Sequence, residues 1–142
     1  MTDVQAALGV SQMNRLNEFV TKRHAIAKRY DEILSDLPVT LPWLHPDIYS
    51  GMHLYPIRLK LPELKVSHCE VFNSLREQGI GVNLHYIPVH MHPYYQTLGF
   101  KQGDFPESEN YYAEAISLPM FPGLTSKQQI QVVNALRRAF KI

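Results

Sequence analysis

The feature that most constrains this fold is a helical hydrophobic pattern at the start of the chain. Apolar residues recur in steps of three and four from Leu16 to Leu37. Upstream, Thr2-Asp3-Val4-Gln5 is a capping box, which starts a helix at once. We therefore predict one leading helix within residues 1–37, roughly 34 residues and about 50 Å long at about 1.5 Å per residue. A helix of that length is long for a small domain.

The first turns of this helix are apolar on every side. Ala6-Ala7-Leu8-Gly9-Val10 has no polar face, which predicts burial on more than one side. Two interpretations remain open. The helix is a solvated one packed on a modest sheet, or its first turns dock on a larger domain or on another subunit.

The rest of the sequence alternates predicted strands with predicted helices. Period-two hydrophobicity predicts strands at 53–59, 82–87 and 116–119, with Pro56 favouring an edge or a bulge. Start signals predict helices from Ser67, Pro106 and Thr125, and Gly79 suits a left-handed helix end. We predict an α+β domain: a long N-terminal helix plus a small three-stranded antiparallel sheet covered by helices.

Length and composition limit the classes of function that this chain can have. The 142 residues are 45% hydrophobic, enough for one domain with a real core. Fourteen basic and 13 acidic residues give a net charge of +1, so electrostatics make no case for nucleic acid or an anionic membrane. No apolar run approaches the roughly 20 residues of a membrane span. One cysteine, Cys69, fits a reducing compartment, so we expect a soluble, cytoplasmic chain.

The stretch Gly81–Tyr95 is the candidate functional segment. It holds three of the seven histidines and three of the eight tyrosines. Its first half alternates like a strand until Pro88, which has no N–H to donate. A strand that leads into a polar, aromatic loop is a common way to build a binding wall.

The side chains of this segment allow several interpretations. His85, His90 and His92 could hold a metal, but they have no helical glutamate or neighbouring cysteine and match no standard zinc pattern. They could instead line a polar substrate pocket or be loop residues held by backbone hydrogen bonds. The tyrosines, Tyr86, Tyr94 and Tyr95, could pack on a sugar or base, or belong to a core edge.

Two other residues carry possible chemistry. Cys69 lies near a predicted helix start, where a thiol pKa falls, but no activating pair accompanies it and we expect a small buried apolar residue. Arg58 could clamp a carboxylate or phosphate, or serve as a solubilising charge on an edge strand. The sequence has no Walker, dinucleotide-binding or Gly-x-Ser-x-Gly motif. Residue chemistry alone therefore names no reaction.

Several segments, in order and spacing, resemble one family, the pyridoxal-phosphate (PLP) aminotransferases that modify nucleotide-linked keto sugars. The resembling segments are residues 1–9, His53-Leu54-Tyr55-Pro56-Ile57-Arg58, residues 79–90 (which include His85-Tyr86-Ile87-Pro88-Val89-His90), and residues 117–125. The resemblance covers essentially the whole chain. It is greatest to the transaminases of pseudaminic acid synthesis, with perosamine synthases and spore-coat polysaccharide aminotransferases close behind.

The resemblance implies a fold, a substrate and a cofactor. It implies the small C-terminal domain of a fold-type I aminotransferase spanning residues 1–142, whose whole enzyme aminates a UDP-linked 4-keto-6-deoxy sugar in cell-surface polysaccharide or glycan synthesis. PLP, the nucleotide sugar and an amino donor, commonly glutamate, are the ligands implied for the whole enzyme. His85, Tyr86 and His90 are the expected substrate-binding residues. A homodimer, or self-association through the N-terminal helix, is also expected.

One departure from the family pattern matters more than the match. Family members carry their Schiff-base lysine in a large N-terminal domain, and the seven lysines here lie outside any such motif. The family motif Asn-Tyr-Arg-Met would begin before Met1. We therefore expect no catalytic, cofactor-binding or metal-binding residue in this chain, and no activity from it alone. The alternative is a stand-alone sugar-binding or protein-interaction remnant that pairs with a full-length paralogue.

Overall fold

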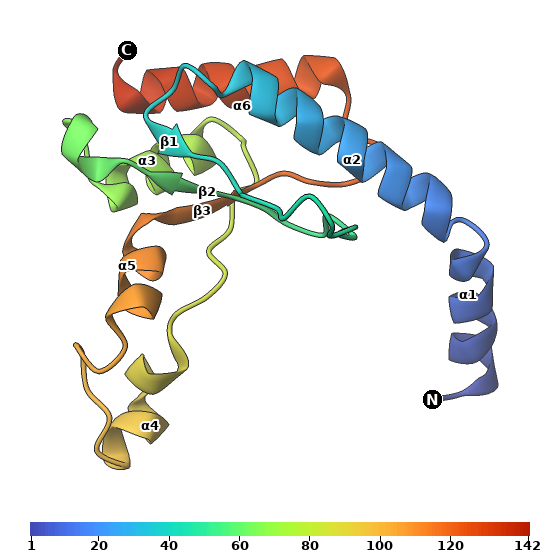
Figure 1. Ribbon diagram of the computed structural model, residues 1–142, viewed down its shortest axis with the longest axis horizontal. Coiled ribbons are helices and arrows are strands. Elements are labelled where there is room, and N and C mark those ends of the chain that lie inside the picture. The colour runs from blue at the N-terminus through green and yellow to red at the C-terminus, as the bar shows by residue number, and fades with distance from the viewer.

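The computed structural model describes residues 1–142 and has the predicted α+β class (Figure 1). The α-helices are α1 (Asp3–Met13), α2 (Leu16–Ile33), α3 (His68–Glu77), α4 (Pro93–Thr97), α5 (Pro106–Glu114) and α6 (Ser126–Phe140). The strands are β1 (Val39–Thr40), β2 (Tyr55–Leu59) and β3 (Ala115–Leu118). Short 3₁₀ turns are η1 (Leu61–Glu63) and η2 (Val89–Met91).

The sheet is antiparallel, with the order β1-β2-β3. Tyr55 pairs with Leu118 and Ile57 pairs with Ile116. β1 pairs only with Arg58 and Leu59, so β2 still has a free edge at Pro56. This explains how a proline is tolerated in the middle strand of the sheet.

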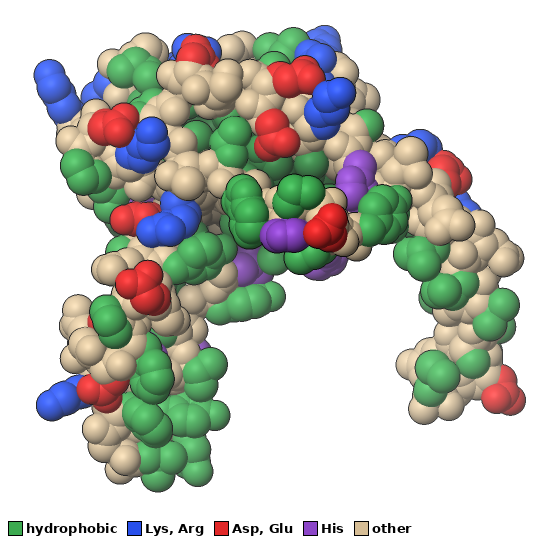
Figure 2. Space-filling view, viewed as in Figure 1, with side chains coloured by type: hydrophobic (Ala, Val, Ile, Leu, Met, Phe, Trp, Pro, Cys, Tyr) green, Lys and Arg blue, Asp and Glu red, His purple; other side chains and the backbone are tan.

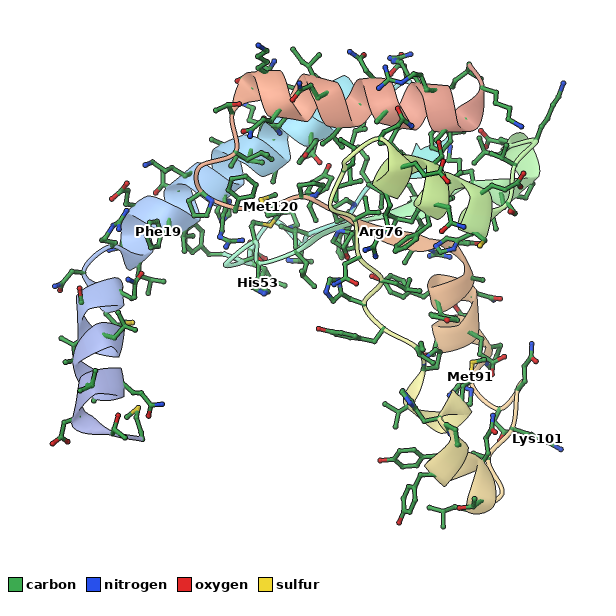
Figure 3. All side chains as sticks on the ribbon, turned by 180° about the vertical axis from the view of Figure 1, so that it is seen from behind. Phe19, His53, Arg76, Met91, Lys101 and Met120 are labelled. Carbon is green, nitrogen blue, oxygen red and sulfur yellow. The ribbon has the colours of Figure 1, made fainter.

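One face of the sheet is covered by helices. α2 and α6 run side by side over it in both ribbon views, and α3 packs against α6 (Figures 1 and 3). Tyr55, Ile57 and Leu59 alternate toward these helices and are almost fully buried. They join a core of 23 buried residues to which α2 and α6 contribute most of the helical members. The predicted three-stranded sheet covered by helices is confirmed.

The predicted single leading helix is wrong: it is two helices, α1 and α2, which meet at Asn14 and Arg15. Arg15 leaves helical geometry with φ −108° and ψ 1°, and its guanidinium lies over the Phe19 ring at 4.6 Å. α1 buries no residue, so the burial expected for Ala6–Val10 is not found in this chain. Without packing on one side, nothing selects a straight continuation of the helix.

Other local predictions also differ from the structure. The strand expected at 82–87 is reduced to one bridge between Asn83 and Ser117, and the two-residue strand β1 was not predicted. Cys69 is exposed, not buried. Complete capping boxes form at the predicted helix starts Thr2, Ser67 and Thr125, and Gly79 adopts the expected positive φ of 77°.

The half-buried side chain of Arg23 connects α2 to two loops beneath it. Its Nη1 donates to the carbonyl oxygens of Met52 at 3.2 Å, His53 at 3.0 Å and Met120 at 3.2 Å. His53 and Met120 lie below α2 in the view of Figure 3. One guanidinium therefore holds together segments that are 97 positions apart in sequence.

Two arms extend from the body on the same side and enclose a hollow (Figures 1 and 2). One is α1, here called the N-terminal arm. The other, residues 88–114, holds η2, α4 and α5 and is here called the aromatic arm. Hydrophobic side chains gather on the lower part of the aromatic arm and along α1 (Figure 2). None of the helices combines the length and hydrophobicity that a membrane span requires.

Candidate functional site

The second face of the sheet positions the candidate site. Because side chains alternate along a strand, Pro56 and Arg58 of β2 and Ser117 of β3 share the face that the helices leave uncovered. Ser117 is only 5% exposed, so another segment covers it. That segment is the beginning of Gly81–Tyr95.

A single backbone bridge fixes this segment beside β3. The amide of Asn83 donates to the Ser117 carbonyl at 3.2 Å, and the Ser117 amide donates to the Asn83 carbonyl at 2.8 Å. The Asn83 side chain accepts from the Leu84 amide at 2.8 Å, which turns the chain just after the bridge. His85 follows and lies over the sheet, with its Nδ1 2.9 Å from the Ser117 hydroxyl.

Tyr86 is next to His85 and faces outward. The two rings meet edge to face at 4.7 Å between centroids, and Tyr86 is 73% exposed. An exposed phenol braced by an imidazole offers an apolar face and a hydroxyl to a ligand. The structure thus brings together two of the three predicted binding residues.

Arg58, on the same sheet face, is paired within the chain. Its Nε donates to Glu114 Oε2 at 2.9 Å, and its Nη2 lies 2.8 Å from the same oxygen in an ion pair. Because β2 is the middle strand, the edge-strand interpretation of Arg58 is wrong for this part of β2. The pair connects the sheet to the end of α5 and thereby orients the aromatic arm.

The third predicted residue, His90, lies inside the aromatic arm. It is 7% exposed, and its Nε2 is 2.8 Å from Glu109 Oε1. Glu109 also accepts the amides of Gly103, at 2.8 Å, and Phe105, at 3.4 Å. The hydrogen bond from His90 is the main reason that the Glu109 pKa lies below its usual value, and these backbone amides lower the pKa further. The ionised carboxylate thus holds the α4–α5 loop to α5.

A cleft of about 320 Å³ opens beside His90 on the aromatic arm. Its lining is mainly apolar and aromatic: Val89, His90, Tyr95, Phe100, Phe105 and Ser108. The His90 ring lies 4.8 Å from the Phe105 ring between centroids. The volume is at the lower end of the range for small-molecule sites, about 300 to 1,000 Å³.

The predicted residues therefore divide between two places. His85 and Tyr86 lie at the sheet, and His90 lines the cleft of the arm. His92 and Tyr94 are exposed. No group of three or more His, Cys, Asp or Glu side chains is arranged to hold a metal ion.

Two residues that organise the site were missed from the sequence. Ser117 is a lone hydroxyl in a strand whose other residues are apolar, and a buried hydroxyl needs a partner. That signal was present in the sequence. Glu109 resembled an ordinary acidic residue of a first helical turn, and its bond to His90, 19 positions away, has no local signature.

Comparison with known sequences identifies the relatives of this chain. Residues 1–137 match the model of the DegT/DnrJ/EryC1/StrS aminotransferase family. Protein MJ1066 of Methanocaldococcus jannaschii is 37% identical over 97% of this chain and 36% of its own length. The spore coat polysaccharide biosynthesis protein SpsC of Bacillus subtilis is 37% identical over 99% of this chain and 37% of its own length.

Solved structures agree with the sequence comparison. Spr1654 of Streptococcus pneumoniae, described as a sugar aminotransferase and solved in a PLP form among others, gives a TM-score of 0.89 at 25% identity. PseC of Helicobacter pylori, an aminotransferase of pseudaminic acid biosynthesis, gives 0.86 at 30% identity. Both matches cover 99% of this chain and only 35–38% of the relatives. The chain, which spans little more than a third of the length of these relatives, belongs to the DegT/DnrJ/EryC1/StrS aminotransferase family.

Proposed function

We propose that this chain serves as the small domain of a PLP-dependent aminotransferase that aminates a UDP-linked 4-keto-6-deoxy sugar. The observation that carries the proposal is the family match over residues 1–137, together with a fold that follows two sugar aminotransferases over 99% of the chain. SpsC acts in spore coat polysaccharide synthesis and PseC in pseudaminic acid synthesis. The proposed biological role is therefore amination of a sugar for a surface polysaccharide or glycan.

We infer that the residues of this chain do not hold PLP by themselves. Transamination with PLP needs a lysine amine in a recess beside the cofactor ring. All seven lysines are exposed, and Lys22 and Lys60 pair with Glu18 and Glu63. This exposure supports the inference that another part of the complete enzyme holds the cofactor. We assign PLP and the amino donor, with glutamate as the first candidate, to the complete enzyme, and expect the chain alone to be inactive.

We assign sugar-nucleotide contacts to His85, Tyr86 and His90. Exposure of the Tyr86 ring and the position of His85 on the uncovered sheet face support the first two. His90 is committed to Glu109 through Nε2, so its contribution is to shape the cleft wall with Phe105. All three act as binding groups in this proposal, and proton transfer is left to the complete enzyme.

A second candidate function is a sugar-binding or protein-interaction module that pairs with a full-length paralogue. It is favoured by one observation: Val4, Leu8, Val10 and Met13 are all at least 60% exposed on the N-terminal arm. Exposed apolar residues on one helix are typical of an interaction surface. The same surface also allows two copies of this chain to pair.

The isolated chain gives the first test. It is mixed with PLP, and its visible absorption spectrum is recorded before and after L-glutamate is added. We expect no saturable change beyond that of PLP with the same concentration of free lysine. A saturable band that glutamate alters would mean that a lysine of this chain does the chemistry, and the proposal would be wrong.

A chimera tests the assignment to the complete enzyme. The matching 144-residue segment of SpsC is replaced by this chain. We expect the chimera to bind PLP and to change its absorbance with glutamate, whereas His85→Ala and Tyr86→Ala variants should weaken binding of UDP-linked sugar. A folded, PLP-bound chimera whose absorbance does not change with glutamate would favour the interaction module. Co-elution of the isolated chain with a full-length relative would favour it as well.

A further inference from the structure

We propose that Ser117 is a positioning residue that selects the His85 tautomer whose proton is on Nε2, so that Nε2 is a hydrogen-bond donor toward the ligand. Its hydroxyl donates to Nδ1, so the single imidazole proton is on Nε2, the ring atom directed away from Ser117. The sugar-nucleotide part of this inference rests on the proposed function. The geometry between the Ser117 and His85 side chains does not depend on the proposed function.

The first step of the argument is the burial of Ser117. Ser117 is only 5% exposed and lies in a strand whose four residues are all buried. The only hydrogen bond that its hydroxyl forms within the chain is the one to His85 Nδ1, at 2.9 Å. A buried hydroxyl left without an acceptor costs about 1–3 kcal/mol.

The second step is the choice of donor. A serine hydroxyl carries one proton, and the one hydrogen-bond partner that the structure gives this hydroxyl is His85 Nδ1. If Nδ1 carried the proton instead, the Ser117 proton would have no acceptor in a buried place. The favoured arrangement is therefore Ser117 Oγ–H donating to Nδ1, with Nε2 protonated.

The third step is the rigidity of the pair. Ser117 is in β3, paired with Pro56 on one side and bridged to Asn83 on the other. The two backbone bonds of that bridge, at 2.8 and 3.2 Å, place His85 only two residues away. Tyr86 packs edge to face on the ring from the solvent side. The imidazole is thus held by a strand, a bridge and an aromatic neighbour.

The chemical consequence concerns the class of ligand atom. Nε2 has no partner within the chain, and in this tautomer it presents an N–H without a positive charge. It therefore suits an uncharged oxygen acceptor, such as a sugar hydroxyl or a carbonyl, as well as a phosphate oxygen. A positively charged partner, or a metal ion, would need the opposite tautomer, in which Nε2 has a lone pair.

Nuclear magnetic resonance of the ¹⁵N-labelled chain tests the tautomer directly. At about pH 8.5, where ordinary histidines are neutral, two-bond ¹H–¹⁵N correlations distinguish protonated from bare ring nitrogens. We expect Nε2 of His85 to be protonated and Nδ1 to be bare. A protonated Nδ1 would overturn the inference, whether or not any sugar nucleotide binds.

Variants test the positioning role. In Ser117→Ala the His85 ring should gain mobility, measured as a lower order parameter from ¹³C relaxation, while Ser117→Thr, which keeps the hydroxyl, should restore it. Ser35→Ala removes an exposed hydroxyl that bonds only to the Glu32 carbonyl, and serves as the control. An unchanged His85 ring in a folded Ser117→Ala chain would overturn the proposal.

Titration with UDP-N-acetylglucosamine separates this inference from the proposed function. If the sugar site exists, His85 signals should shift on titration, and Ser117→Ala should weaken binding about two- to tenfold, the worth of one hydrogen bond. Equal affinity of Ser117→Ala and the unsubstituted chain would refute the positioning role. If the unsubstituted chain shows no shift at His85 or Tyr86, the sugar contacts assigned to them are wrong, and the tautomer measurement still decides the role of Ser117.

Discussion

At the scale of single residues, Arg23 connects segments that are up to 97 positions apart in sequence. Its guanidinium serves three carbonyl groups from two loops. We expect Arg23→Ala to lower the free energy of unfolding by about 1–3 kcal/mol, because these carbonyls lose a charged donor in a half-buried place. Urea denaturation measures the change, and Lys28→Ala, on an exposed position of the same helix, should stay within about 0.5 kcal/mol. Equal effects of the two variants would contradict this account.

Two buried tyrosines predict how stability responds to alkaline pH. Burial raises the pKa of Tyr30 and of Tyr55 above the usual 10.0, and for Tyr55 the hydrogen bond to Asp31 adds to the effect. The folded chain therefore keeps both protons at a pH where the unfolded chain loses them. Stability is complete below about pH 10 and falls as pH rises above it.

The matched variants are Tyr55→Phe and Tyr86→Phe. Tyr55→Phe should be less stable at neutral pH, because Asp31 loses its donor, but its urea midpoint should fall less steeply between about pH 9 and about pH 11. Tyr86→Phe, at a 73% exposed position, should keep the original slope. If all three proteins lose stability in parallel, burial of Tyr55 is not the cause.

At the scale of elements, two identical caps should have different consequences. Thr2 and Thr125 each form a complete capping box, but α1 buries no residue whereas α6 buries seven. We expect Thr125→Ala to lower the free energy of unfolding by about 1 kcal/mol. Thr2→Ala should reduce helicity of residues 3–13 and leave the denaturation midpoint unchanged. Circular dichroism and urea titration separate the two effects, and a global loss from Thr2→Ala would mean that α1 packs on the body.

The aromatic arm gives a second prediction at this scale. Glu109→Gln should speed amide exchange at Gly103, because the amide loses a carboxylate acceptor, and Glu107→Gln, an exposed neighbour without such bonds, should not. The Glu109 pKa is lowered chiefly by His90, so the contact is fully present above about pH 4.5 and is lost as the pH falls through the lowered value. Equal exchange in both variants would mean that other contacts hold this loop.

The sequence was sufficient wherever one segment decides its own structure. Three capping boxes, Gly79 and the helices from Ser67, Pro106 and Thr125 depend on side chains within a few residues, and all of them formed. The break at Asn14 and Arg15 could not be predicted, because Met13 and Leu16 continue the three-residue step across it. The prediction of a strand at 82–87 was wrong, because alternating hydrophobicity does not show how many backbone hydrogen bonds a neighbouring strand can form with the segment.

The candidate site was predictable only in part, for the same reason. The density of histidine and tyrosine in Gly81–Tyr95 marked the segment, and the family resemblance marked His85, Tyr86 and His90. That His85 meets Ser117 and His90 meets Glu109 depends on contacts 32 and 19 positions apart. Such pairings follow from the packing of β3 and α5, which no local pattern describes.

At the scale of the whole molecule, the N-terminal arm predicts association. Val4, Leu8, Val10 and Met13 are exposed apolar side chains on several sides of α1, without a partner in this chain. We expect the isolated chain to self-associate at high concentration, because pairing would remove these side chains from water. Light scattering after size-exclusion chromatography should show a mass that falls to the monomer in Leu8→Glu. Ser11→Glu adds the same charge at another exposed position of the helix and tests whether charge alone disperses the chain. A strictly monomeric chain at every concentration would contradict this prediction.

The bridge between Asn83 and Ser117 has a consequence beyond the site. β3 is the last strand of the sheet, and an outer strand exposes unpaired backbone groups that can recruit a strand from another molecule. Residues around Asn83 occupy that border and shield part of it. The segment that carries His85 thus also protects this sheet edge from pairing with other molecules. Substitutions that loosen it would threaten the solubility of the protein as well as its capacity to bind a ligand.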